Sequence, residues 1–62
     1  MEIGDWFEGL NEVNTYKVVK FLDDTRVSCN VYVYGRFVGI TSEYVNTLLQ
    51  MRKLTPLEKE LM

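Results

Sequence analysis

The chain has 62 residues and a net charge of −2, and 47% of its residues are hydrophobic. This length allows one domain with a small core, and the apolar content excludes intrinsic disorder. Cys29 is the only cysteine and histidine is absent, which excludes an internal disulfide and leaves no ordinary set of zinc ligands. No apolar run reaches the roughly 18 residues that a membrane span needs. We therefore expect a single domain over residues 1–62 in the reducing cytoplasm, with no membrane partner.

The N-terminal segment is acidic, and its apolar residues follow the spacing of one helical face, at positions 3, 6, 7, 10 and 13. Asp5 is a suitable N-cap for such a helix, although Gly9 in its interior lowers its stability by about 1 kcal/mol relative to alanine. The pattern predicts an acidic helix over about 5–12. Its stability would depend on docking Trp6, Phe7 and Leu10 against the rest of the domain.

Three runs rich in β-branched and aromatic residues follow, at 16–22, 27–34 and 37–40. The Asp23-Asp24 pair and Gly35 mark the turns between them. We predict a three-stranded antiparallel meander over about 16–40. The two-residue loop of its second hairpin is either Tyr34-Gly35 or Gly35-Arg36.

The middle run alternates valine with tyrosine, where a half-buried strand would alternate apolar with polar residues. Either hairpin register gives the same two faces. The first face has Val31, Val33, Val38 and Ile40, and the second has Tyr32, Tyr34 and Phe37. The first strand has two alternatives: either Tyr16, Val18 and Leu22 lie on the valine side with Lys20, or Val19 and Phe21 lie there with Lys17. Both faces of the sheet are then partly apolar, and one helix cannot cover both.

Two helices are expected after the sheet. Thr41 or Ser42 can cap a helix over about 42–53 that has a broad apolar stripe and the cations Arg52-Lys53 in its last turn. The segment 55–58 reads as a capping box with proline at the first helical position, which predicts a final helix over about 56–61. The predicted fold class is therefore α+β, in the order α-β-β-β-α-α, with the three-stranded meander packed by helices.

No residue pattern in the chain supports catalysis. Cys29 lies within an apolar strand and has no histidine that could act as its base, so a buried structural thiol is the better interpretation. The carboxylates of Asp23 and Asp24 fit a turn, and the glycines do not form a phosphate-binding loop. We expect no enzyme activity, no cofactor and no bound metal.

The apolar surface favours a protein-binding function. Aromatic residues, methionine and arginine are enriched at interfaces, and this small chain has more apolar faces than its helices can cover. The candidate partner-binding residues are Trp6, Phe7, Tyr32, Tyr34, Arg36 and Phe37. Size and the absence of catalytic residues favour a small regulator or inhibitor, such as a viral or plasmid protein, that occupies the surface of an unidentified partner protein. A homodimer is the alternative partner arrangement, through the tyrosine face or through an edge strand.

The second hypothesis is nucleic-acid binding, with Tyr32, Tyr34 and Phe37 as a stacking platform for bases. The run VYVYGRFVG and the α-β-β-β-α order resemble the middle of a double-stranded-RNA-binding domain over about residues 16–40. That family has a lysine-rich helix start where this chain has residues 40–44, which include Glu43, so we do not assign the chain to it. The pI of about 4.9 also disfavours nonspecific binding to phosphates.

Overall fold

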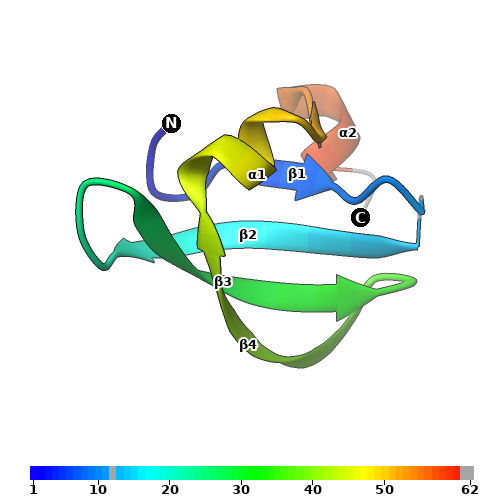
Figure 1. Cartoon of the computed structure of the whole chain (residues 1–62). Coiled ribbons are helices and arrows are strands. Elements are labelled where there is room, and N and C mark those ends of the chain that lie inside the picture. Colours follow the sequence, from blue (N-terminus) through cyan, green and yellow to red (C-terminus); the bar gives the residue numbers. More distant parts are fainter. Residues whose placement is uncertain (12, 61–62) are drawn as a thin grey trace.

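The computed structural model describes residues 1–11 and 13–60. Within them the elements are β1 (Trp6–Glu8), β2 (Asn14–Phe21), β3 (Arg26–Val33), β4 (Arg36–Tyr44), α1 (Val45–Leu49), β5 (Arg52–Lys53) and α2 (Pro56–Glu60). The strands pair antiparallel into one sheet in the order β4-β3-β2-β1-β5 (Figure 1). The predicted three-stranded meander packed by helices is therefore wrong, because β1 and β5 extend the sheet by two strands.

Strand β1 stands where the sequence predicts a helix over 5–12, and that prediction is wrong. Phe7 pairs with Tyr16 of β2 on one side and with Lys53 of β5 on the other. These two neighbours hydrogen-bond the backbone of β1, whereas a short isolated helix with Gly9 in its interior would be marginal in water. The strand also sends Trp6 and Phe7 to opposite faces of the sheet, and Phe7 reaches the core. Position 12 of the predicted range lies outside the described residues.

The long helix predicted over 42–53 is also wrong. Thr41 and Ser42 belong to β4, where they pair with Cys29 and Ser28, and only the five residues of α1 are helical. Tyr44 is the N-cap residue and makes no capping hydrogen bond with its side chain. Strand pairing continues to this point because β3 is eight residues long and offers a partner along its whole length. No sequence window of β4 contains that information.

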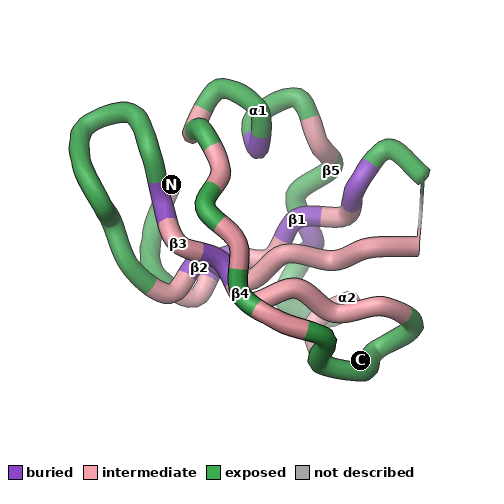
Figure 2. The backbone as a smooth tube through the Cα atoms, turned by 60° about the horizontal axis from the view of Figure 1, so that its bottom comes forward, coloured by how far each residue is buried: buried purple, intermediate pink, exposed green. Residues whose placement is uncertain are grey.

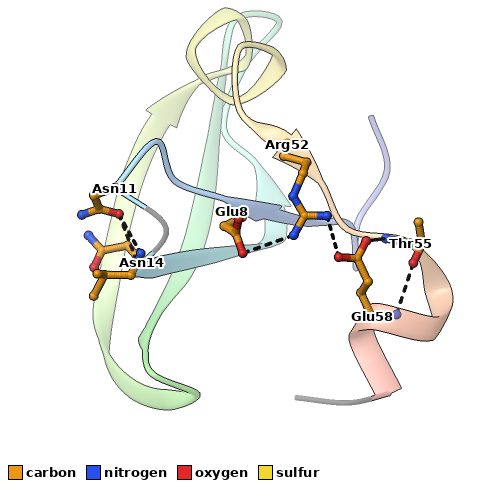
Figure 3. Close-up of polar contacts among 7 residues, drawn as sticks. Glu8, Asn11, Asn14, Arg52, Thr55 and Glu58 are labelled. Atoms are coloured by element: carbon orange, nitrogen blue, oxygen red, sulfur yellow. Dashed lines mark hydrogen bonds and ion pairs between the residues drawn. The ribbon is translucent and has the colours of Figure 1, made fainter.

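The C-terminal helix agrees with the sequence. The Thr55 N–H donates to Oε1 of Glu58 over 3.0 Å, and the Glu58 N–H donates to Oγ1 of Thr55 over 3.2 Å (Figure 3). These reciprocal bonds are the predicted capping box, and α2 begins at Pro56 as predicted. Position 61 of the predicted range lies outside the described residues.

The β3–β4 hairpin uses Tyr34-Gly35 as its loop, which is one of the two predicted registers. Both loop residues have positive φ, 50° for Tyr34 and 77° for Gly35, as a type I′ turn requires. Tyr32 pairs with Phe37, but Val31 pairs with Gly39, so Val38 is an extra residue in a β-bulge. The bulge shifts the alternation by one and moves Ile40 from the expected valine side to the side of Tyr32.

A second bulge, at Val19, explains why the first strand could not be assigned one phase. Val18 pairs with Cys29, whereas Phe21 pairs with Val27 beyond the irregularity. Cys29 and Val27 are two apart in the unbroken strand β3, so Val18 and Phe21 share their side of the sheet. Both predicted phases therefore occur, one in each half of β2.

The core lies on one face of the sheet, beneath α1. Its fully buried residues come from four elements and are Phe7, Val18, Val27, Cys29 and Leu48. Partly buried Met1, Tyr16, Val45 and Met51 surround them. Figure 2 shows the buried segments as separate purple patches on β1, on the β2–β3 pair and on α1, which the fold brings together.

Ion pairs join β5 to β1 and also β5 to α2. Arg52 donates to Glu8 over 3.2 Å and to Glu58 over 2.5 Å, so its guanidinium lies between two carboxylates (Figure 3). Nζ of Lys53 lies 3.4 Å from Oδ2 of Asp5. Burial alone would raise the pKa of Asp5, but a hydrogen bond from the Glu2 N–H and the charge of Lys53 outweigh it and lower the pKa. The acidic N-terminal segment is thus attracted to basic residues of the same chain.

Candidate binding face

The side of the sheet opposite the core carries a row of aromatic residues. Because side chains alternate along a strand, Trp6 lies on the other side from Phe7 in β1, and Tyr32 lies on the other side from Val31 in β3. Phe37 of β4 is directly opposite Tyr32, and Ile40 is opposite Asn30 on the same side. We call this surface, formed by Trp6, Lys17, Tyr32, Phe37 and Ile40, the aromatic face.

The three rings of the aromatic face contact one another in sequence. The ring centroids of Trp6 and Tyr32 are 4.9 Å apart, and those of Tyr32 and Phe37 are 5.7 Å apart with the planes at 67°. Edge-to-face and tilted contacts at these distances are favourable for aromatic pairs. The row joins β1 to the β3–β4 hairpin, which lies far from β1 in the sequence.

Exposure rises along the aromatic face toward β4. Trp6 and Tyr32 are partly buried, whereas Phe37 is 53% and Ile40 is 70% exposed. The buried core cluster includes α1 but no member of this row. The exposed end of the aromatic face is therefore open to a binding partner.

Basic side chains border the rings. Nζ of Lys17 lies 5.7 Å from the centroid of the Trp6 ring, within cation–π distance. Lys20 pairs with Ser28 on the same side of the sheet, whereas Arg36, at the start of β4, pairs with Val33 and lies on the side of the core. Among the described residues, Lys17, Lys20 and Arg36 form no ion pair, whereas Arg26, Arg52 and Lys53 each do. The face therefore combines apolar rings with unneutralised positive charge.

Tyr34 lies in the hairpin turn next to this surface. Its side chain is 84% exposed, and its backbone has the positive φ that asparagine and glycine adopt much more readily than tyrosine. The conformation is unfavourable for tyrosine, and the exposed ring gains little burial in return. Such a residue is a candidate for a contact outside the chain.

Of the six predicted partner-binding residues, the structure brings Trp6, Tyr32 and Phe37 together. Tyr34 is the first residue of the loop of the same hairpin, and Arg36 follows this loop on the core side of the sheet. Phe7 is separated from them, because it is 2% exposed in the core on the opposite side. Ile40 was assigned to the wrong side of the sheet because nothing in the sequence marks the bulge at Val38. The side on which Lys17 lies was left open, because the phase of the first strand was not determined.

The reactive groups of the chain are held in structural positions. Cys29 is fully buried, and burial, with a smaller effect from Glu43, raises the pKa of its thiol to about 11, so it is protonated at neutral pH.

In the described part of the chain no three acidic or sulfur side chains converge as a metal site. No helix there is long and apolar enough to cross a bilayer. An open hollow of about 440 Å³ at the start of α1 is lined by residues 24, 25 and 44–47.

No family model, no curated protein and no solved structure matches this chain.

Proposed function

We propose that the chain is a small non-enzymatic binding module of the cytoplasm that occupies the surface of a partner protein. The aromatic face is the proposed contact, with Tyr34 at its border. The observation that carries the proposal is the row Trp6–Tyr32–Phe37, which lies on the side of the sheet away from the core and becomes more exposed toward β4. Exposed aromatic residues are typical of the centres of protein interfaces.

The positive charge of this surface indicates the kind of partner. Lys17 and Lys20 have no carboxylate partner among the described residues, so an acidic protein surface would complement them. A regulator or inhibitor of the viral or plasmid type acts in this way, by covering a surface that its target needs. The target class remains part of the proposal and rests on charge and on the size of the chain.

The test compares two variants in capture from a lysate of the native host. Phe37→Ser removes an exposed ring from the aromatic face, and Leu10→Ser removes a side chain that is 82% exposed but lies outside it. We expect a partner that wild type and Leu10→Ser retain and Phe37→Ser loses, with the far-UV circular dichroism of all three unchanged. Equal retention by the two variants would place the contact elsewhere.

Single-stranded nucleic acid is the second candidate, favoured by the unpaired cations beside Trp6. Aromatic rings with nearby lysines can stack bases and bind phosphates. It ranks second because the net charge is −2, because Lys17 already lies over the Trp6 ring, and because the rings pack against each other. Trp6 is the only tryptophan, so quenching of its fluorescence by an oligonucleotide at low salt, reversed by added salt, would favour this candidate. Unchanged fluorescence at low salt would exclude it.

A further inference from the structure

Strand β4 leaves a long edge of the sheet without a partner strand. It pairs with β3 on one side only, whereas the other edge strand, β5, has just two residues. Phe37, Val38 and Ile40 of β4 are 53%, 58% and 70% exposed. Natural edge strands commonly block further pairing with lysine, proline or a bulge; β4 contains neither lysine nor proline, and its bulge at Val38 lies near its N-terminal end. The open backbone and the exposed apolar side chains together make β4 suitable for adding another strand.

We propose that a second copy of this chain pairs antiparallel with β4, about a two-fold axis at Ile40. A two-fold interface requires that the same strand complement itself, residue by residue. With Ile40 on the axis, Gly39 of one chain lies opposite Thr41 of the other. Because Val38 is the extra residue of the bulge, Phe37 then lies opposite Ser42, and Arg36 lies opposite Glu43.

The faces of β4 agree with this register. Phe37 and Ser42 are paired with Tyr32 and Ser28 of β3, which lie on the aromatic side of that regular strand. Residues that would oppose each other across the axis therefore point to the same side, as antiparallel pairing demands.

Charge complementarity selects a second copy as the occupant. Arg36 and Glu43 pair with Val33 and Val27 of β3, so both point to the side of the sheet that holds the core. Neither forms an ion pair among the described residues of the chain. In the dimer each Arg36 faces the Glu43 of the other chain at the separation of directly opposed side chains, about 4.5–5.5 Å between Cβ atoms. The two-fold axis forms this pair twice.

The dimer would also enlarge the aromatic face. Phe37 and Ile40 lie at the β4 end of that face and are its most exposed members. Pairing along β4 brings these residues of both chains to the centre of one continuous ten-stranded sheet, with Trp6 and Tyr32 on either side. The association buries apolar surface that a core of this size needs for stability.

The first test uses charge exchange, with mass measured by sedimentation velocity from micromolar to millimolar concentration. Arg36→Glu alone and Glu43→Arg alone each place like charges opposite one another twice, so we expect the dimer dissociation constant to rise about ten-fold or more. The double variant Arg36→Glu with Glu43→Arg restores both pairs and should dimerise like wild type. A folded wild type that stays monomeric throughout, or a double variant as weak as the single ones, overturns the proposal.

The second test fixes the register by cross-linking. Ile40→Cys places the new thiol opposite its own copy, at a distance that a disulfide can span, whereas Thr41→Cys, one position away, places it opposite Gly39. We expect mild oxidation to give a covalent dimer with Ile40→Cys and not with Thr41→Cys, while the native Cys29 is buried in both. Equal cross-linking of the two variants, or none, would overturn the register. Because the readout is the mass of the chain by itself, it is independent of partner capture through the aromatic face.

Discussion

At the scale of single residues, the turn between β2 and β3 depends on one carboxylate. Asp23 accepts hydrogen bonds from the backbone N–H groups of Thr25 and Arg26, each over 2.8 Å, and from the Arg26 guanidinium. The bonds from Thr25 and Arg26 lower the pKa of Asp23 to about 2, because they favour its ionised form. The sequence marked this residue as a turn former, and the structure adds that its charge stabilises the turn.

The lowered pKa of Asp23 predicts a loss of stability in acid. The folded-state value of about 2 lies below the ordinary 3.8, so the stabilisation is complete above about pH 4 and is lost as the pH falls toward 2. We expect Asp23→Asn to lower the unfolding temperature at pH 6 and to reduce its further drop between pH 4 and 2. Thermal unfolding followed by circular dichroism measures both. Asp24→Asn is the matched control, and an equal effect from it would contradict the assignment to Asp23.

At the scale of elements, the β3–β4 hairpin carries both a strained turn and the exposed end of the aromatic face. Its type I′ loop favours Asn-Gly, and this chain has Tyr34-Gly35, with φ of 50° at the tyrosine. The two residues after the loop bring Phe37 opposite Tyr32, and the bulge at Val38 then brings Ile40 to the same side. Local backbone geometry therefore determines which side chains form the candidate site.

The turn predicts a substitution that separates stability from binding. Tyr34→Asn replaces a side chain that disfavours positive φ by one that tolerates it, so we expect the free energy of unfolding to rise by about 0.5–1 kcal/mol. Urea unfolding measures this change. If Tyr34 contacts the partner, the same variant should bind it more weakly although it is more stable. Unchanged stability would mean that the turn tolerates tyrosine without strain, and unchanged binding would remove Tyr34 from the contact.

At the scale of the whole molecule, the short helix α1 links the two edges of the sheet. The chain runs from β4 through α1 to β5, and β5 pairs with β1 at the opposite edge (Figure 1). A helix of five residues has little stability by itself. It is fixed by Leu48, which is fully buried in the core, and by the Val45 N–H, which donates to the Thr25 carbonyl over 2.8 Å. The single core therefore depends on this helix.

This dependence predicts a large effect of one leucine and a small effect of its neighbour. Leu48→Ala should lower the free energy of unfolding by about 2–5 kcal/mol, because it leaves a cavity beneath α1. A core of this size supplies only roughly 3–5 kcal/mol, so we expect the variant to be largely unfolded in solution. Leu49→Ala, at a position that is 61% exposed, should change stability by less than about 0.5 kcal/mol. Denaturant unfolding followed by circular dichroism would detect the difference, and equal effects would contradict the packing of α1.

Prediction from the sequence was most accurate where the signal is local. The capping box at Thr55 and Glu58, the Asp23 turn and the strands predicted at 16–22 and 27–34, observed at 14–21 and 26–33, depend on neighbouring residues, which a short window contains. The alternation also placed Tyr32 and Phe37 on one side of the sheet, where the structure has them, whereas Trp6 was assigned to a helix. The arrangement of the three rings in one row across three strands was not visible in the alternation.

The sequence by itself determined the chemical limits of this protein: one buried thiol with no histidine to activate it, and an aromatic alternation that must leave one side of a sheet apolar. Only the tertiary structure decided that residues 6–8 are a strand, because their partners lie between 7 residues (Glu8 to Thr15) and 46 residues (Phe7 to Lys53) away and no local spacing encodes them. It also decided the side on which Ile40 lies, since one extra residue in a strand reverses every position that follows. The physical reason is the same in both cases. Strand pairing is a long-range interaction, and its register, more than local propensity, determines which side chains meet.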